Sequence, residues 1–329
     1  FENTLSYGKV IGKHDFNILA GTMADNNSGK FTGAAIQDIP STSIDDGVSL
    51  GFNTPRETQA GYGYEYIEVV ASLLTRLQYN YDQKYLFTAL VRRDGSPKFG
   101  ANKPYGIFPS ASLGWVITEE NFLYKNPIVN FLKLRGSWGI SGNDRIVSNA
   151  FESTIGGGRN YTFGTEDVLT NGAAPTRIAN PDLQWEETTQ TNIGFDAKLF
   201  KRVSLTVDLF NKTTTDMLLG LEVPGYVGNP GPIANIAELT NKGIEAELGY
   251  NNNFGDFAFE LIGNVSYVEN EITSLGPEKE FLVGQTFSPQ GLQITRISVG
   301  QPIGYFFGHQ TDGIFQNQAE IDAYVNEDG

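Results

Sequence analysis

The chain has 329 residues and a formal net charge of −15 at pH 7, which argues against nucleic acid as a partner because phosphates require clustered lysine and arginine. It contains no cysteine, which excludes disulfide frameworks and thiolate metal sites. No run approaches the roughly 18 apolar residues of a spanning helix, and no charged-then-apolar start resembles a secretion signal, so we expect that signal to have been removed or never included.

The clearest hairpin lies between Leu77 and Arg92. Apolar and polar residues alternate from Leu77 to Tyr81, a polar turn follows at 82–84, and the alternation returns from Tyr85 to Arg92. A period of two places apolar side chains on one face of a strand and polar side chains on the other. The pattern therefore predicts strands with a different solvent on each face.

The same pattern recurs twice farther along the chain. Residues 193–199 and 203–209 form a second predicted hairpin, and residues 244–250 and 257–267 form a third across an Asn-rich turn. A water-soluble sandwich also alternates, so alternation alone predicts only an all-β fold.

The connectors between the predicted strands differ in length in a regular order. Short connectors follow Tyr7, Tyr81, Leu199 and Tyr250, a moderate one spans 118–130, and longer ones span 23–65, 93–104, 141–184 and 211–239 and follow Glu271. Outer-membrane barrels have this asymmetry, and pairing between their strands satisfies the backbone polar groups in lipid. The order predicts an antiparallel transmembrane β-barrel with short periplasmic turns and long extracellular loops.

Aromatic residues make up 12% of the chain, and many lie beside the predicted short turns: Tyr7, Tyr79, Tyr81, Tyr85, Tyr250, Phe254 and Phe257. Tyrosine rings suit the level of the lipid headgroups, so these residues predict an interfacial girdle. Ordinary aromatic pairing across strands is the alternative.

A series of short motifs follows in order through most of the chain. They are Asp94-Gly95-Ser96, Phe99-Gly100, Phe108-Pro109-Ser110, Gly114-Trp115, Glu120-Asn121-Phe122, the run 134–139, Gly142-Asn143, the run 180–186, Thr214, Asp216 and Leu218, the run 241–245, the run 299–304, Gly308, and the run 312–315. In these motifs the chain resembles the middle barrel of the SusC/RagA-type TonB-dependent outer-membrane transporters.

The resemblance implies a larger assembly. It implies a barrel of about 22 strands, of which residues 1–329 are the central part with about ten strands, while the plug domain and the C-terminal strands are absent from this chain. It also implies a bacterial outer membrane location, contact with outer-membrane lipid, a SusD-like surface lipoprotein as a lid, and a TonB complex acting through the missing N-terminal region. The expected function is import of a glycan or peptide nutrient as the channel subunit, with no cofactor and no enzymatic activity.

Motifs with possible chemistry are few. His14 and His309 are the only histidines, and the adjacent pairs Glu119-Glu120 and Glu186-Glu187 point to opposite faces if they lie on strands. The glycine run 156–158 lacks the context of a phosphate loop, and the acidic run 44–47 lacks the alternating ligands of a hand-type calcium loop. We therefore expect no catalytic, cofactor or metal site.

Polar residues on the inward face are the main candidates for contact with a plug or a solute: Arg76, Arg135, Asp196, Lys198, Asp208, Glu245, Glu247 and Glu260. In a wide barrel such groups line the lumen. The loop aromatics Tyr161, Phe163 and Tyr226 are candidates for ligand contact, because flat apolar rings suit sugar rings and peptide side chains.

Two other classes of protein stay open at this point. A soluble β-rich carbohydrate-binding module or adhesin would place polar residues on the outward face of strands such as 205–209. A glycoside hydrolase on a β scaffold would need two carboxylates about 5 to 10 Å apart.

Overall fold

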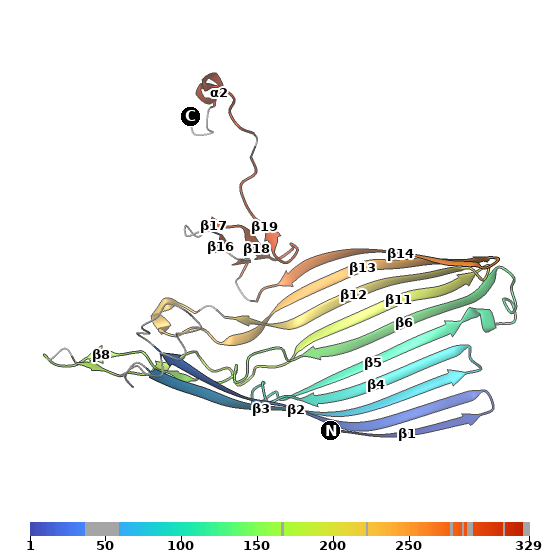
Figure 1. Cartoon of the computed structure of the whole chain (residues 1–329), viewed down its shortest axis with the longest axis horizontal. Helices are drawn as coiled ribbons and strands as arrows, with labels where there is room; N and C mark the ends of the chain where they lie inside the picture. Colours follow the sequence, from blue (N-terminus) through green and yellow to red (C-terminus); the bar gives the residue numbers. More distant parts are fainter. Residues whose placement is uncertain are drawn as a thin grey trace.

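The computed structural model describes residues 1–36, 59–165, 168–221, 223–276, 279–284, 286–287, 292–311 and 313–324. Ten strands form one antiparallel sheet in which neighbours in the sequence are neighbours in space (Figure 1). They are β1 (Glu2–Ile11), β2 (His14–Ile36), β3 (Gln59–Tyr81), β4 (Tyr85–Gly95), β5 (Tyr105–Val116), β6 (Val129–Asn143), β11 (Glu186–Leu199), β12 (Val203–Gly220), β13 (Ile233–Phe254) and β14 (Phe257–Ser274). The predicted antiparallel all-β architecture is confirmed.

The remaining elements are short and lie in the connectors. They are η2 (Ile117–Glu119), β7 (Ile155–Gly156), β8 (Tyr161–Thr162), β9 (Leu169–Thr170), β10 (Ala174–Pro175), η3 (Gly225–Val227), β15 (Phe281–Val283), β16 (Thr286–Phe287), β17 (Leu292–Gln293), β18 (Thr295–Ser298), β19 (Tyr305–Phe306) and α2 (Gln318–Ala323). Among the described residues, no helix has the length and hydropathy of a membrane span.

The tight turns all lie at one end of the sheet. They join β1 to β2, β3 to β4, β11 to β12 and β13 to β14, at the end shown on the right in Figure 1. Two of them place non-glycine residues in the left-handed region, where the φ of Asp82 is 53° and that of Lys201 is 60°. The other two use glycine there, with φ values of 60° at Gly12 and 59° at Gly255.

Several strands are longer than the sequence pattern predicted. The predicted connector 23–65 was wrong over much of its length. β2 and β3 stay paired from His14 and Tyr81, at the end with the tight turns, to Ile36 and Gln59. β1 likewise continues past Tyr7 to Ile11. Alternation of apolar and polar residues is required only where a strand crosses the membrane. Outside the membrane two strands can stay paired as a two-stranded ribbon without that alternation.

The connector predicted at 211–239 and the Asn-rich turn were also misplaced. β12 runs to Gly220 and β13 begins at Ile233, so only 221–232 connects them. The asparagines at 251–253 are paired with β14, and the turn is Gly255-Asp256. Asparagine is common in turns, yet here the ladder extends beyond it.

The register separates two faces of different polarity. On one face Phe195, Val207 and Ala246 lie side by side on β11, β12 and β13. On the other face Asp196, Thr206 and Glu247 follow the same path. Each strand therefore contributes alternately to an apolar and a polar face, as a lipid-facing barrel wall requires.

The apolar face is uncovered. Ile193, Leu248 and Val265 are 64%, 55% and 68% exposed on it. Figure 1 shows the ten strands as one curved layer, and no second sheet or helix of the described chain stacks on their apolar side. A soluble module would not leave this face bare, because exposed apolar patches of this size drive association.

The aromatic residues beside the tight turns gather on the apolar face. His14 Nδ1 lies 2.8 Å from the Tyr79 hydroxyl, and the rings of Phe16 and Tyr79 lie 4.9 Å apart. Tyr81 and Tyr85 stack at 6.2 Å. The rings thus pair across strands and also form a band at one level of the sheet, as a membrane girdle does.

We predict that Leu205→Arg destabilises the membrane-inserted protein by about 2 to 4 kcal/mol, because Leu205 lies on the apolar face between Ala197 and Leu248. Thr206→Arg should be nearly neutral, since its neighbours across the strands are Asp196 and Glu247. The measurement is a denaturant unfolding titration of the whole protein in lipid vesicles. An equal loss of unfolding free energy from both substitutions would contradict the assignment of Leu205 to the lipid face and Thr206 to the inner face.

A second prediction concerns the carboxylate of Glu120, in the connector between β5 and β6. The hydroxyl of Tyr85 donates to Glu120 at 2.6 Å and Trp115 Nε1 donates at 3.2 Å. The Tyr85 hydrogen bond, followed by those of Trp115 and Lys84, holds the pKa of Glu120 below its ordinary value. Its contribution to stability is therefore present above the unfolded-state pKa and is lost as the pH falls through the lower folded-state pKa.

We expect Glu120→Gln to be less stable than the native protein at neutral pH, with the difference disappearing on acidification below the ordinary glutamate pKa of about 4.3. The measurement is the free energy of unfolding of both proteins from pH 7 to pH 3. Curves that stay parallel over this range would show that the hydrogen bond does not act through the charged form.

Candidate functional site

The adjacent glutamates at 186 and 187 do not form a catalytic pair. Glu186 accepts a hydrogen bond from Asn143 on the inner face, whereas Glu187 pairs with Thr215 on the outer face. Over the described ranges, no group of three histidine, aspartate or glutamate side chains could hold a metal ion. The acidic run 44–47, which lacks the pattern of a calcium loop, and the motif residue Asp312 lie outside the described residues.

Several of the sequence motifs meet in one place, at the end of the sheet opposite the tight turns. Phe99 packs on Trp185 with ring centroids 4.9 Å apart, and Phe108 meets the same indole edge-on at 5.4 Å. With Ala150 and Leu183 they form a buried cluster in which each residue is at most 6% exposed. We call these five residues the loop junction.

Hydrogen bonds tie two loops and the start of β13 together at the loop junction. Ser96 Oγ donates to Asp144 at 3.0 Å, and Asn102 Nδ2 donates to Asp182 at 2.7 Å. Asn180 Nδ2 reaches the carbonyl of Ile233 at 2.8 Å. The loops 96–104 and 144–185 and the start of β13 are therefore held as one unit.

Gly100 marks how closely the loops approach. Its backbone N–H donates to the Leu183 carbonyl at 3.4 Å. A Cβ at Gly100 would lie 1.9 Å from the carbonyl oxygen of Pro181. Because the Pro181 oxygen is a backbone atom that cannot rotate away from a new Cβ, only glycine fits at this position without moving a loop.

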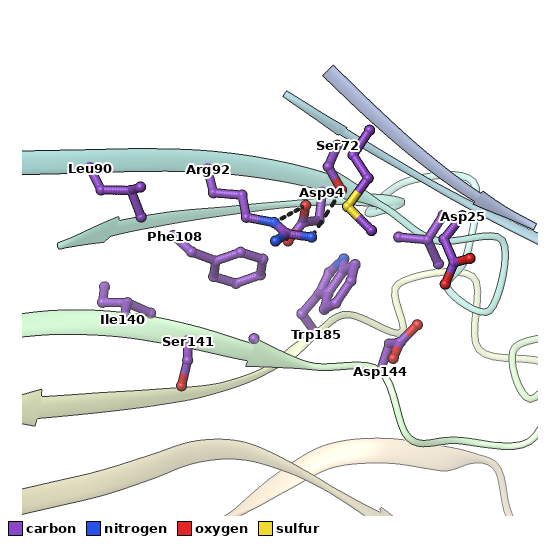
Figure 2. A pocket seen from close by; sticks show the side chains of 13 residues that line it. Asp25, Ser72, Leu90, Arg92, Asp94, Phe108, Ile140, Ser141, Asp144 and Trp185 are labelled. Carbon is purple, nitrogen blue, oxygen red and sulfur yellow. Dashed lines mark hydrogen bonds and ion pairs between the residues drawn. The ribbon is translucent and has the colours of Figure 1, made fainter. Parts of the chain in front are cut away.

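A cavity of about 430 Å³ opens beside the loop junction on the inner face. Arg92 Nε donates to both carboxylate oxygens of Asp94, at 2.7 and 2.9 Å, and Arg92 Nη2 donates to Ser72. Figure 2 shows Asp25 and Asp144 on one side of the Trp185 ring and the Arg92 pair on the other. The cavity therefore combines an indole with fixed charged groups, which is a mixture that binds polar solutes.

The eight inward candidates all lie on the polar face by register, and three of them meet. Arg135 makes a bidentate contact with Asp208 at 2.6 and 2.5 Å, and its Nε lies 3.2 Å from Asp196. Glu245 is the cross-strand neighbour of Asp208, and Glu247 is that of Thr206. This part of the inner wall therefore carries more negative than positive charge.

The other inward candidates are not brought into that group. Arg76 is paired by register with Leu19 and Leu90, Lys198 with Ser204, and Glu260 with Asn251 near the tight turns. Contact of any of the eight with a plug or a solute stays a prediction.

The loop aromatics predicted as ligand contacts are exposed and lie in two separate places. Tyr161 and Phe163 are 66% and 70% exposed, and their rings meet edge-on at 5.2 Å. Tyr226 is 90% exposed in η3, in a different loop. Sequence reasoning missed Asp25 and Asp144 beside the cavity, because both lay in segments predicted as irregular loops.

The chain matches the family model described as TonB dependent receptor-like, beta-barrel, over residues 3–322. It is 39% identical over 249 residues to TonB-dependent receptor P39 of Formosa agariphila, covering 75% of this chain and 22% of that protein. It is 30% identical to TonB-dependent receptor SusC of Bacteroides thetaiotaomicron, covering 85% of this chain and 28% of that protein. The chain thus spans less than a third of either relative.

Solved structures give the same result. The structure of the RagAB peptide transporter matches with a TM-score of 0.76 and 25% identity, covering 93% of this chain and 32% of that chain. The resemblance of the sequence motifs to SusC/RagA-type proteins is confirmed by these matches. The relatives carry the names of receptors and transporters rather than enzymes.

A third prediction tests the loop junction with two matched glycines. Gly100→Ala should open the loops to protease about tenfold faster, a loss of about 1.4 kcal/mol in local stability, because its Cβ meets the Pro181 carbonyl. Gly157→Ala is the control, since its Cβ would have no atom within 4 Å. Limited proteolysis of the outer loops on intact cells is the measurement, and equal cleavage rates would contradict the role of Gly100.

Proposed function

We propose a transport function from one premise: the chain belongs to the β-barrel family of TonB-dependent receptors. Proteins of this family lie in the bacterial outer membrane, which agrees with the bare apolar face of the sheet. The whole protein imports a nutrient across that membrane, and this chain supplies part of the barrel wall and its outer loops.

The observation that carries the proposal is the two-faced sheet with all tight turns at one end. Its apolar face suits hydrocarbon and its polar face suits a hydrated or plugged lumen. Over the described ranges β1 and β14 pair on one side only, and lipid does not tolerate open edges. Further strands of the whole protein are therefore needed to close the wall.

The proposed mechanism is gating without covalent chemistry. A SusD-like surface lipoprotein captures the solute at the outer loops, and the TonB complex moves a plug that fills the lumen. Support comes from a structural neighbour, the RagAB peptide importer, which is described in "closed-closed" and "open-open" states. The charged group around Arg135 is a suitable contact for a plug, because it lies on the inner wall.

The nutrient belongs to one of two classes, an oligosaccharide or a peptide. The neighbour RagAB is named for peptide transport, and the indole and charged groups of the cavity suit either class. A glycosidase is disfavoured because the relatives carry the names of receptors and transporters and because the adjacent carboxylates Glu186 and Glu187 lie on opposite faces. A soluble adhesin is disfavoured by the uncovered apolar face.

We predict that deleting the gene abolishes growth on one complex glycan or peptide source and leaves growth on simple sugars or amino acids unchanged. Disruption of the TonB complex should give the same loss on that source, because the plug would no longer move. The measurement is growth of the deletion strain over a panel of sole nutrients, with a complemented strain as control. Unchanged growth on every source would overturn the transport proposal.

A further inference from the structure

The hairpin of β2 and β3 reverses its polarity along its length. At the end of the sheet with the tight turns, the outer face of this hairpin carries apolar residues such as Ile18 and Leu77, which are cross-strand neighbours. Beyond the other strands, the outer face carries Lys30 and Glu65, which form an ion pair at 3.1 Å. Ile67 and Val69 are the last large apolar residues on the outer face of β3; farther out, at 29–35 and 60–66, the large apolar side chains lie on the inner face, away from where lipid would be.

Four aromatic rings occupy that inner face. Phe31 lies between Tyr62 and Tyr64, with ring centroids 6.0 and 5.4 Å away, and Tyr66 follows on the same face of β3. We call these four residues the aromatic strip. Their exposed fractions are 45% for Phe31 and 55%, 63% and 40% for Tyr62, Tyr64 and Tyr66.

Two glycines set how the rings lie. Gly33 is the cross-strand partner of Tyr62, and Gly29 is that of Tyr66. A Cβ at either glycine would lie 2.6 Å from the ring of its partner tyrosine. The rings therefore lie across the backbone of the neighbouring strand and leave one flat side open.

The described loops contact the hairpin next to the aromatic strip, at Glu68. Glu68, two residues after Tyr66 on the same face of β3, is held by the Ser148 hydroxyl and by Lys98 at 3.5 Å. Among the described residues, the Phe31 ring packs against Tyr62 and Tyr64, and more than half of each tyrosine stays exposed. The inner face of the ribbon between residues 29 and 35 and between residues 60 and 66 also carries no charged residue.

We propose that the aromatic strip binds the sugar rings of a neutral oligosaccharide, an inference that rests on the proposed transport function. The C–H face of a pyranose stacks on an open aromatic face, and the phenol hydroxyls of tyrosine can hydrogen-bond to sugar hydroxyls. The rise of a strand separates Tyr62 from Tyr66 by about 13 Å, which is room for a short stretch of a linear glycan.

The exposed area favours a small ligand over a folded protein. The open parts of the four rings amount to roughly 400 Å², taking about 200 Å² for a whole aromatic side chain. A stable protein interface buries about 800 Å² on each partner and has a charged or polar rim. The aromatic strip is uncharged and about half that size, so a few sugar rings can cover it.

The test uses the whole transporter, purified with any lipoprotein that accompanies it, and the double variant Tyr62→Ala with Tyr64→Ala. The probes are neutral linear hexasaccharides of glucose, xylose and mannose, with an uncharged hexapeptide for comparison, and calorimetry measures binding. The native protein should bind at least one hexasaccharide, and the double variant should bind it about tenfold more weakly. Phenylalanine at both positions should keep most of the affinity, because the ring faces remain.

The matched control is Lys30→Ala with Glu65→Ala, which changes the opposite face of the same ribbon and should leave binding unchanged. Circular dichroism checks that each variant keeps its strands.

The proposal is overturned if no hexasaccharide binds the native protein, if the alanine variant binds the hexasaccharide as well as the native protein does, or if the alanine variant loses only the binding of the peptide. The proposal is also overturned if the alanine variant still binds the sugar but no longer purifies with the lipoprotein, because the aromatic strip would then be a protein contact. None of these results alters the gene-deletion growth test, so failure of the sugar site and failure of transport are distinguishable.

Discussion

The pairing of backbone polar groups is the constraint on which the rest of the structure depends. In hydrocarbon each unpaired N–H or C=O costs several kcal/mol, so every strand in the wall needs a neighbour on both sides. β2 to β13 meet this requirement through antiparallel ladders with few irregularities. Once the ladders are fixed, the period of two assigns each side chain to lipid or to the lumen. The tight turns then fall at one end and the loops at the other, so the architecture that supports transport follows from hydrogen bonding and alternation.

The sequence motifs act mainly through the packing of the outer loops. Phe99, Phe108 and Trp185 come from segments up to 86 residues apart and meet in one buried cluster. Gly100 allows the backbone of one loop to touch another. The motifs therefore do not mark a catalytic centre. They mark a rigid base from which the outer loops, with their exposed aromatic residues, can project toward a solute or a partner.

Strict alternation made the lipid-facing strands predictable from the sequence, as between Ile193 and Leu209, and it also placed Arg135, Asp196 and Asp208 on the inner wall. Their mutual contact was not predictable, because it depends on the register of β6, β11 and β12 and on side-chain geometry. The distal ribbon was missed for another reason. Outside the membrane the apolar residues of this ribbon change to the inner face, and glycines interrupt the alternation. A search for strands with apolar residues on the outer face therefore does not find it. The spacing of Tyr62, Tyr64 and Tyr66, each two residues apart, was the available signal of a strand.

The reversal of polarity in β2 and β3 links the fold to its proposed role. A ribbon that faced water on both sides would gain nothing from exposed rings, and a ribbon in lipid would place them outward. Rings on the inner face are favourable only if the space above the lumen holds something that covers them, at least part of the time. Below the ribbon, the wall around Asp208 and Glu245 carries charged groups rather than rings, while the Trp185 indole beside the cavity gives a solute a second stacking surface. A solute held at the aromatic strip would wait above this inner surface until a change in the plug opens the way, which is the order of events that a gated importer requires.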